Sequence, residues 1–121
     1  HYLNEVESFE FEGLSGMEKM EDLMAQLRKT PPDEIGGLAV EARADYQQRT
    51  KTNVATGAQT ALSLPPSNVL AYTLKGGSLV TVRPSGTEPK IKVYYAIREK
   101  TGDAALCLYK TLAAAMHPML T

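Results

Sequence analysis

The chain has 121 residues, of which 43% are hydrophobic, and its formal net charge is −1. This length suits one domain with one hydrophobic core, and no apolar run approaches the roughly 18 residues that a membrane-spanning helix needs. The charge is unevenly divided: residues 1–49 hold 11 acidic and 5 basic residues, whereas residues 50–121 hold 3 acidic and 8 basic residues. The basic half favours an anionic ligand, but it is too small to indicate a nucleic-acid-binding protein.

The first part of the chain predicts a strand and a helix. Residues 6–11 alternate weakly between apolar and polar, which is typical of a short strand, and residues 1–5 are interpreted as a linker. Ser15 and Glu18 have the spacing of a capping box at the start of a helix that ends before Pro31. A partner-binding groove is one interpretation of the apolar face of this helix, and the core is the other; the residues of that face are Met17, Met20, Leu23, Met24 and Leu27.

The middle of the chain predicts one strand followed by a long loop. Residues 38–46 alternate, with one apolar side and with Ala39, Glu41, Arg43 and Asp45 on the other side; this predicts a half-buried strand with Arg43 and Asp45 on its outward, polar side. These two residues would then face the cleft of a larger protein or simply face water. Residues 47–68 are polar and lack periodicity, so we expect a long loop that is mobile or borders a functional cleft.

The last part of the chain predicts three strands and a second helix. The strands are expected at residues 69–74, 79–83 and 90–98, with a hairpin turn at 75–78. The helix begins near Thr101, an N-cap residue type, and Cys107 is expected to be buried within it. The order of strand, helix, four strands and helix predicts an α+β fold, in which two helices cover one face of a mainly antiparallel sheet.

Residues 83–94 are the most informative segment. Pro84 and Pro89 restrict the backbone of a tight turn, and Gly86 allows a left-handed conformation or a close approach of another group. Successive amides in such a turn can converge on an anion, and the planar guanidinium of Arg83 suits phosphate oxygens. Basic residues are expected to cluster around this segment, namely Arg83, Lys90, Lys92 and Arg98. An ordinary hairpin turn is the alternative, since Pro, Gly and Ser are common turn residues.

This segment resembles the phosphate-binding loop of the α-D-phosphohexomutases, in the C-terminal domain of the bacterial phosphoglucomutase/phosphomannomutase type. Residues 31–35 and 64–70 are similar to parts of the same domain, so the resemblance covers nearly the whole chain. It implies a fold like that of the TATA-box-binding protein, with the order β-α-β-β-β-β-α. It also implies that residues 1–121 form a single domain, the C-terminal domain of a larger multidomain enzyme.

The resemblance further implies a role for this domain. The parent enzyme would be cytoplasmic and would interconvert hexose 1-phosphate and hexose 6-phosphate, using a phosphoserine and a Mg²⁺ ion held by other domains. The chain has no Asp-x-Asp-x-Asp set and no serine beside an activating base, so no catalytic or metal-binding residue is assigned to it and the isolated chain is expected to be inactive. The domain would hold the phosphate that is not transferred, and the residues implied are Arg83, Ser85, Gly86, Thr87 and Lys92. For Lys92, a solvated strand lysine is the alternative.

Two other functions remain open from the sequence. One is the C-terminal domain of a phosphoglucosamine mutase, within the same family. The other is a nucleic-acid or protein-interaction module that uses an exposed sheet face with Arg43, Lys92, Tyr94 and Arg98. Base-stacking surfaces usually offer two aromatic residues, and Tyr94 is the only clear one. The expected partners are therefore a hexose phosphate and the other domains of the same chain, with no nucleic acid and no membrane.

Overall fold

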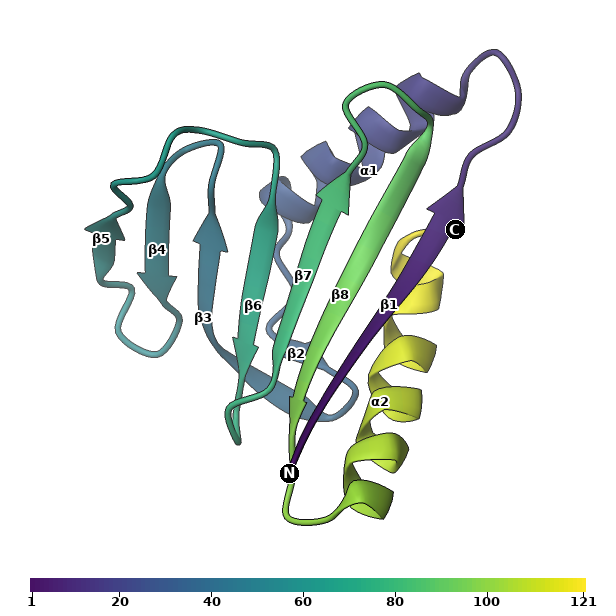
Figure 1. Cartoon of the computed structure of the whole chain (residues 1–121). Helices are drawn as coiled ribbons and strands as arrows, with labels where there is room; N and C mark the ends of the chain where they lie inside the picture. Colours follow the sequence, from purple (N-terminus) through teal and green to yellow (C-terminus); the bar gives the residue numbers. More distant parts are fainter.

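An eight-stranded antiparallel sheet is the framework of the computed structural model, which describes residues 1–121 (Figure 1). The main path of the sheet runs in the order β1 (Tyr2–Glu10), β8 (Lys90–Arg98), β7 (Leu79–Pro84), β6 (Leu70–Leu74), β3 (Leu38–Asp45), β4 (Thr50–Asn53) and β5 (Gln59–Ala61). The short β2 (Glu34–Ile35) pairs with β3 off this path. Consecutive strands β6, β7 and β8 are neighbours, which places the segment predicted to bind phosphate at one hairpin end of the sheet.

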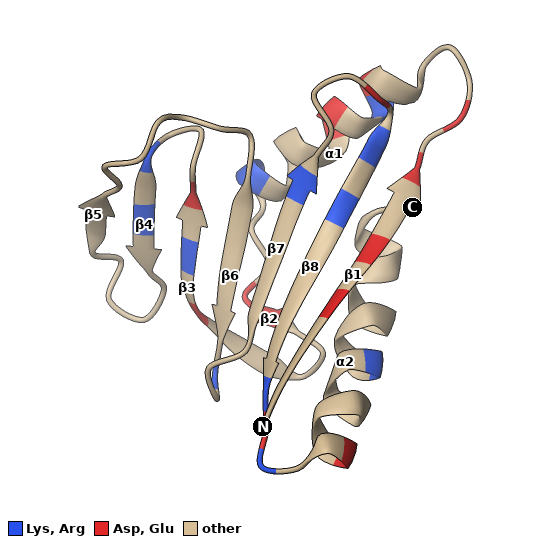
Figure 2. Cartoon of the chain, in the orientation of Figure 1, with Lys and Arg blue, Asp and Glu red and all other residues tan.

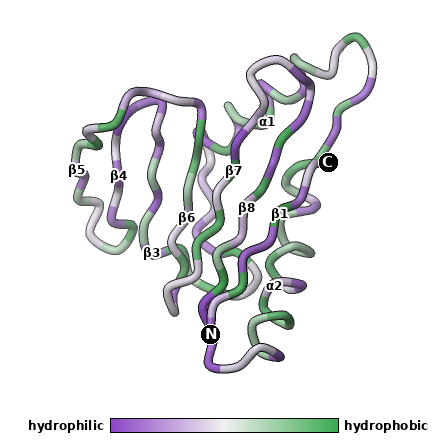
Figure 3. The backbone as a smooth tube through the Cα atoms, in the orientation of Figure 1, coloured by the Kyte–Doolittle hydropathy of each residue, from purple (hydrophilic) through white to green (hydrophobic).

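Both helices cover the same face of the sheet, as predicted for the α+β fold. They are α1 (Gly16–Lys29) and α2 (Gly102–Met116), and a 3₁₀ turn (His117–Met119) follows α2. One core cluster joins Met20 and Met24 of α1, Leu112 of α2 and the buried side chains of the central strands. The methionines of α1 therefore belong to the core and not to a partner-binding groove. Figure 3 shows the hydrophobic residues gathered in the central strands and in α2. Neither helix is long and apolar enough to cross a membrane.

β8 defines the two faces of the sheet. Its buried side chains, which point toward the helices, are Ile91, Val93, Tyr95 and Ile97. The alternate residues lie on the other side, called the open face below, and include Lys92, Tyr94 and Arg98. The strand register places Arg83 of β7 directly opposite Lys92, so Arg83 also lies on the open face.

β1 is longer than the sequence predicted. It begins at Tyr2 and pairs with the whole of β8, from Tyr2 opposite Arg98 to Glu10 opposite Lys90. Residues 2–5, interpreted as a linker, are therefore strand residues. β1 is an edge strand that is only partly covered by α2, so few of its positions are buried and its apolar alternation is weak.

Two further strands lie within the predicted long loop. β4 pairs with β3, and β5 pairs with β4, so that residues 47–68 contain a hairpin that extends the sheet. The side chain of Asn53 accepts hydrogen bonds from the amides of Ala55 and Thr56 and closes its turn. The hairpin shows no apolar alternation because it has no buried residue on either face.

A β-bulge in β3 corrects the predicted orientation of Arg43 and Asp45. Val40 pairs with Leu74, but Ala42 pairs with Thr73, so one extra residue enters the strand at this point. The alternation predicted from the sequence is thereby inverted after Val40. Arg43 lies opposite the buried Tyr72, and both Arg43 and Asp45 lie on the helix-covered side of the sheet.

The predicted side-chain cap at the helix start is confirmed for α2 and wrong for α1. Ser15 is the N-cap of α1, but its side chain makes no capping hydrogen bond, so the predicted capping box is wrong. Thr101 caps α2 as predicted, because its hydroxyl oxygen accepts a hydrogen bond from the Ala104 amide at 3.1 Å. Cys107 is exposed and not buried, since the inward face of α2 is formed by Ala105, Leu112 and Met116.

Candidate functional site

A polar cavity of about 400 Å³ opens at the β7–β8 connection, on the open face of the sheet. Four of the five predicted site residues line it, namely Arg83, Ser85, Gly86 and Lys92. Glu88, Lys90 and Tyr94 complete most of the lining, whereas Thr87 does not line it. β7 and β8 bring Arg83 and Lys92 together because these residues are paired neighbours in the sheet.

The backbone amides of the connection are already engaged within the chain. The Ser85 hydroxyl oxygen accepts hydrogen bonds from the amides of Thr87 at 3.3 Å and Glu88 at 3.1 Å. The Ser85 amide donates to the Lys90 carbonyl at 2.8 Å, whereas Gly86 makes no backbone hydrogen bond. The expected group of convergent amides is therefore present, but it closes on an oxygen of the chain itself.

Gly86 is not in a left-handed conformation, which corrects one of the two reasons predicted for a glycine at this position. A Cβ atom built on Gly86 would meet no atom within 4 Å. Neither the backbone conformation nor the packing of the chain requires glycine here. The space beside Gly86 therefore stays open to an approaching group.

Positive charge is concentrated beside this cavity. Figure 2 shows basic residues at the adjoining ends of β7 and β8, where Arg83, Lys90 and Lys92 lie. Arg83 and Lys92 are exposed, and neither forms an ion pair. Arg98 does not join this cluster, because it lies at the opposite end of β8 beside Tyr2. Tyr2 was not predicted to be on the open face, because the sequence analysis began this strand only at residue 6; it is 73% exposed there.

The end of the connection is anchored to the segment between β1 and α1. The Pro89 carbonyl accepts a hydrogen bond from the Phe11 amide at 2.8 Å. Gly16, the first residue of α1, packs so closely that an added Cβ would overlap the Phe11 carbonyl oxygen and lie 2.9 Å from the Pro89 Cβ. No local pattern in the sequence signals this contact, because it joins residues far apart in the chain.

The arrangement offers binding groups without a reacting pair. No group of three or more His, Cys, Asp or Glu side chains lies close enough together to hold a metal ion. The only clear pKa shifts belong to three tyrosines on the helix-covered side, Tyr72, Tyr95 and Tyr109, whose pKa values are raised, chiefly by burial. The cavity at the β7–β8 connection therefore combines three cations, a hydroxyl and one free amide with a single carboxylate, that of Glu88. The excess of donors and of positive charge suits recognition of an oxyanion.

Comparisons with known proteins bear on the family of the chain. Residues 18–106 match the family described as phosphoglucomutase/phosphomannomutase, C-terminal domain. A phosphoglucomutase of Staphylococcus haemolyticus is 40% identical over 87 residues, which cover 72% of this chain and 16% of that protein. A phosphoglucomutase of Staphylococcus aureus strain MSSA476 is 36% identical over 96 residues, which cover 79% of this chain and 17% of that protein. The chain thus spans about a sixth of the length of these relatives.

Proposed function

The chain belongs to the phosphoglucomutase/phosphomannomutase family, whose C-terminal domain it matches, and from this premise we propose that its β7–β8 connection binds the phosphate group of a hexose phosphate. The observation that carries the proposal is the cavity in which Arg83 and Lys92 lie side by side and form no ion pair, with Glu88 as the one acidic residue of the lining. The guanidinium of Arg83 can hold two phosphate oxygens, and Lys92 adds a point charge.

The Ser85 hydroxyl supports this proposal because its oxygen occupies the position of an anion. It accepts hydrogen bonds from the amides of Thr87 and Glu88, as a phosphate oxygen would. Rotation of the Ser85 side chain would release both amides to the ligand, and the free amide of Gly86 would join them. In this arrangement Thr87 contributes its amide, and its side chain stays outside the cavity.

The proposed role within the longer protein follows from these groups. The domain holds the phosphate that is not transferred, while the sugar stays free to turn between the 1- and 6-positions. A parent enzyme of this kind interconverts hexose 1-phosphate and hexose 6-phosphate in the cytoplasm, and its partners at this site are the substrate and the other domains of the same chain. The phosphoserine and the Mg²⁺ ion that the reaction uses are supplied by those other domains.

Titration of the chain with inorganic phosphate and with glucose 6-phosphate, followed by amide NMR, tests the binding site. We expect saturable chemical-shift changes at residues 85–88. Binding should weaken with added salt, because the attraction between exposed charges is screened. Arg83→Ala removes a charge-assisted hydrogen bond of roughly 1.5–3 kcal/mol, so Kd should rise about ten- to a hundred-fold. Arg98→Ala is the matched control, since Arg98 lies on the same face at the far end of β8 and should leave Kd unchanged. Equal losses for the two variants, or no shifts at residues 85–88, would contradict the assignment.

The isolated chain should bind without catalysing. It offers neither an activated nucleophile nor a metal site beside the cavity. A coupled assay for the conversion of glucose 1-phosphate to glucose 6-phosphate should show no activity above the buffer blank. Turnover by the purified 121-residue chain would refute the division of labour between domains.

A further inference from the structure

A second cavity lies on the opposite, helix-covered side of the sheet and has no place in the function proposed above. Its volume is about 230 Å³, and it lies between the end of α1 and strands β3, β4, β5 and β6. The argument uses six of its lining residues: Arg28, Arg43, Asp45, Thr50, Thr52 and Tyr72. The bulge in β3 creates this site, because it turns Arg43 and Asp45 toward the helix-covered side.

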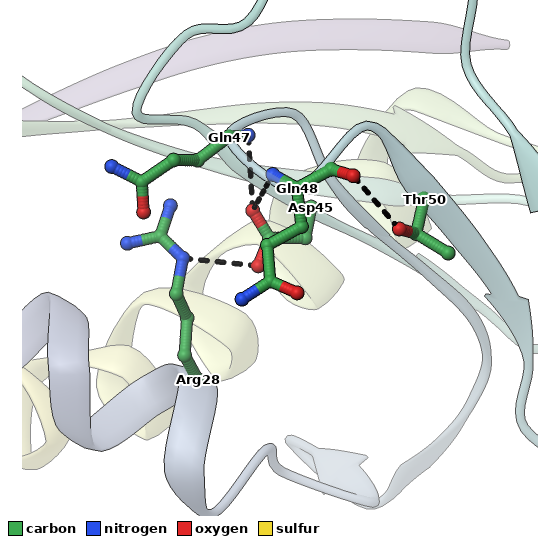
Figure 4. Close-up of polar contacts among 5 residues, drawn as sticks. All are labelled: Arg28, Asp45, Gln47, Gln48 and Thr50. Atoms are coloured by element: carbon green, nitrogen blue, oxygen red, sulfur yellow. Dashed lines mark hydrogen bonds and ion pairs between the residues drawn. The ribbon is translucent and has the colours of Figure 1, made fainter.

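Asp45 is the one acidic residue that lines this cavity, and its carboxylate already accepts three hydrogen bonds. One of its carboxylate oxygens accepts hydrogen bonds from the amides of Gln47 at 3.0 Å and Gln48 at 3.3 Å. The other accepts a hydrogen bond from the Arg28 Nε at 3.0 Å. Figure 4 shows these three contacts converging on the Asp45 carboxylate, with the terminal nitrogens of Arg28 left free of dashed lines. The carboxylate thus holds Arg28 and the turn after β3, and its single charge offsets only one of the two guanidinium groups.

Two buried donors at the cavity have no acceptor, and a second arginine beside them forms no ion pair. The Arg28 side chain is 16% exposed, and its Nη2 atom is buried and has no hydrogen-bond partner. The Tyr72 hydroxyl is also buried without a partner, in a residue that is 1% exposed. Arg43 lies opposite Tyr72 in the sheet and forms no ion pair. Burial raises the pKa of Tyr72 to about 12, so its hydroxyl stays a neutral donor at neutral pH.

A ligand with several acceptor oxygens would satisfy these groups together. Buried donors without partners are costly. Two guanidinium groups and only one carboxylate line this cavity, which leaves an excess of positive charge. Thr50 and Thr52 add hydroxyl groups to the same wall. We propose that this cavity is a binding site for a small oxyanion, a phosphate or carboxylate group held by Arg28, Arg43 and Tyr72. The site lies on the other side of the sheet from the β7–β8 connection and does not depend on that site.

The test uses the chain with Arg83→Ala as background, so that binding at the β7–β8 connection is weakened. Inorganic phosphate and malonate are titrated in separate experiments, with sodium chloride at matched ionic strength as the blank, and amide shifts are followed at residues 50–52 and 70–72. Saturable shifts with phosphate alone, or with malonate alone, identify the oxyanion that the site prefers. No saturable shift with either probe overturns the proposal.

Tyr72→Phe is the decisive variant because it removes only the hydroxyl and keeps the ring in the core. Without an anion it should be at least as stable as the background chain, since a buried unpaired group has been removed. With the anion, Kd should rise about tenfold or more. Tyr2→Phe, on the open face and outside both cavities, is the control and should leave Kd unchanged. Arg43→Gln should raise Kd further; if this variant fails to fold, Tyr72→Phe alone decides. An unchanged Kd in Tyr72→Phe overturns the proposal, whatever happens at residues 85–88.

Discussion

Removal of the Tyr95 hydroxyl should lower the stability of the chain by a defined amount. Tyr95 of β8 is 1% exposed, and its hydroxyl donates a hydrogen bond to the Glu7 Oε1 of β1 at 2.7 Å. The Tyr95 ring also packs edge-on against Tyr109 of α2, with ring centroids 5.2 Å apart. Tyr95→Phe keeps the ring contact and deletes only the bond to the carboxylate.

The size of the effect follows from the two partners. A hydrogen bond to a charged group contributes roughly 1.5–3 kcal/mol to folding. Glu7 is only half-buried, so water can replace the lost donor and the effect should lie near the lower limit, at about 1.5 kcal/mol. The free energy of unfolding in water should fall by this amount, while the m-value, the slope of this free energy against urea concentration, stays the same.

Urea unfolding followed by circular dichroism measures this change. Tyr94→Phe is the matched control, because Tyr94 is the adjacent residue, lies on the open face and is 39% exposed. Its free energy of unfolding should change by less than about 0.5 kcal/mol. In a double-mutant cycle with Glu7→Gln, the two losses should be less than additive. Equal effects of the two tyrosine variants, or full additivity with Glu7→Gln, would refute the reasoning.

Three further predictions concern pH, packing and local stability. Burial raises the pKa values of Tyr72 and Tyr95, so above pH 10 the unfolded chain loses protons that the folded chain keeps. In urea titrations at pH 9–11, the free energy of unfolding should therefore fall by at most about 1.4 kcal/mol per pH unit for each tyrosine. A urea midpoint that stays constant over this pH range would contradict this prediction. Gly16→Ala should destabilise the chain by about 1–3 kcal/mol in thermal unfolding because its Cβ has no room, whereas Gly86→Ala should leave stability nearly unchanged; the reverse order would refute the packing argument. Amide exchange at residues 50–53 should be slower than in the connection that follows β5, since β4 is paired on both sides, and equally fast exchange would show that the hairpin is not formed.

The sequence predicted the parts of the fold whose pattern depends on one buried face. β8 alternates along its whole length, and α1 carries its apolar residues on one side, because each element packs against the core in a regular way. The β4–β5 hairpin and the start of β1 were missed because pairing with a neighbouring strand, and not burial, holds them in place. The bulge in β3 is likewise a property of pairing, and the sequence of β3 alone shows an unbroken alternation.

The candidate site was predicted in the same partial way. The residues that the family resemblance singled out include Arg83, Ser85 and Lys92, and these three line one cavity. Arg83 and Lys92 are paired on β7 and β8, and Ser85 lies in the connection between these strands. The sequence did not reveal that the Ser85 oxygen holds the amides of Thr87 and Glu88. Such a bond depends on a side-chain rotamer, which no pattern of residue types determines. The anchor between Pro89 and Phe11 was missed because its two residues are far apart in the chain.

The bulge in β3 has an evolutionary consequence. A strand without it would alternate regularly from Leu38 onward, and the side chains of Arg43 and Asp45 would emerge on the opposite surface of the domain. Deletion of the single residue Glu41 would therefore transfer a cation and a carboxylate between the two surfaces without changing either residue. Related chains that differ by one residue in this strand should accordingly differ in the charge of both surfaces, and alignments that ignore the gap would compare residues with opposite orientations.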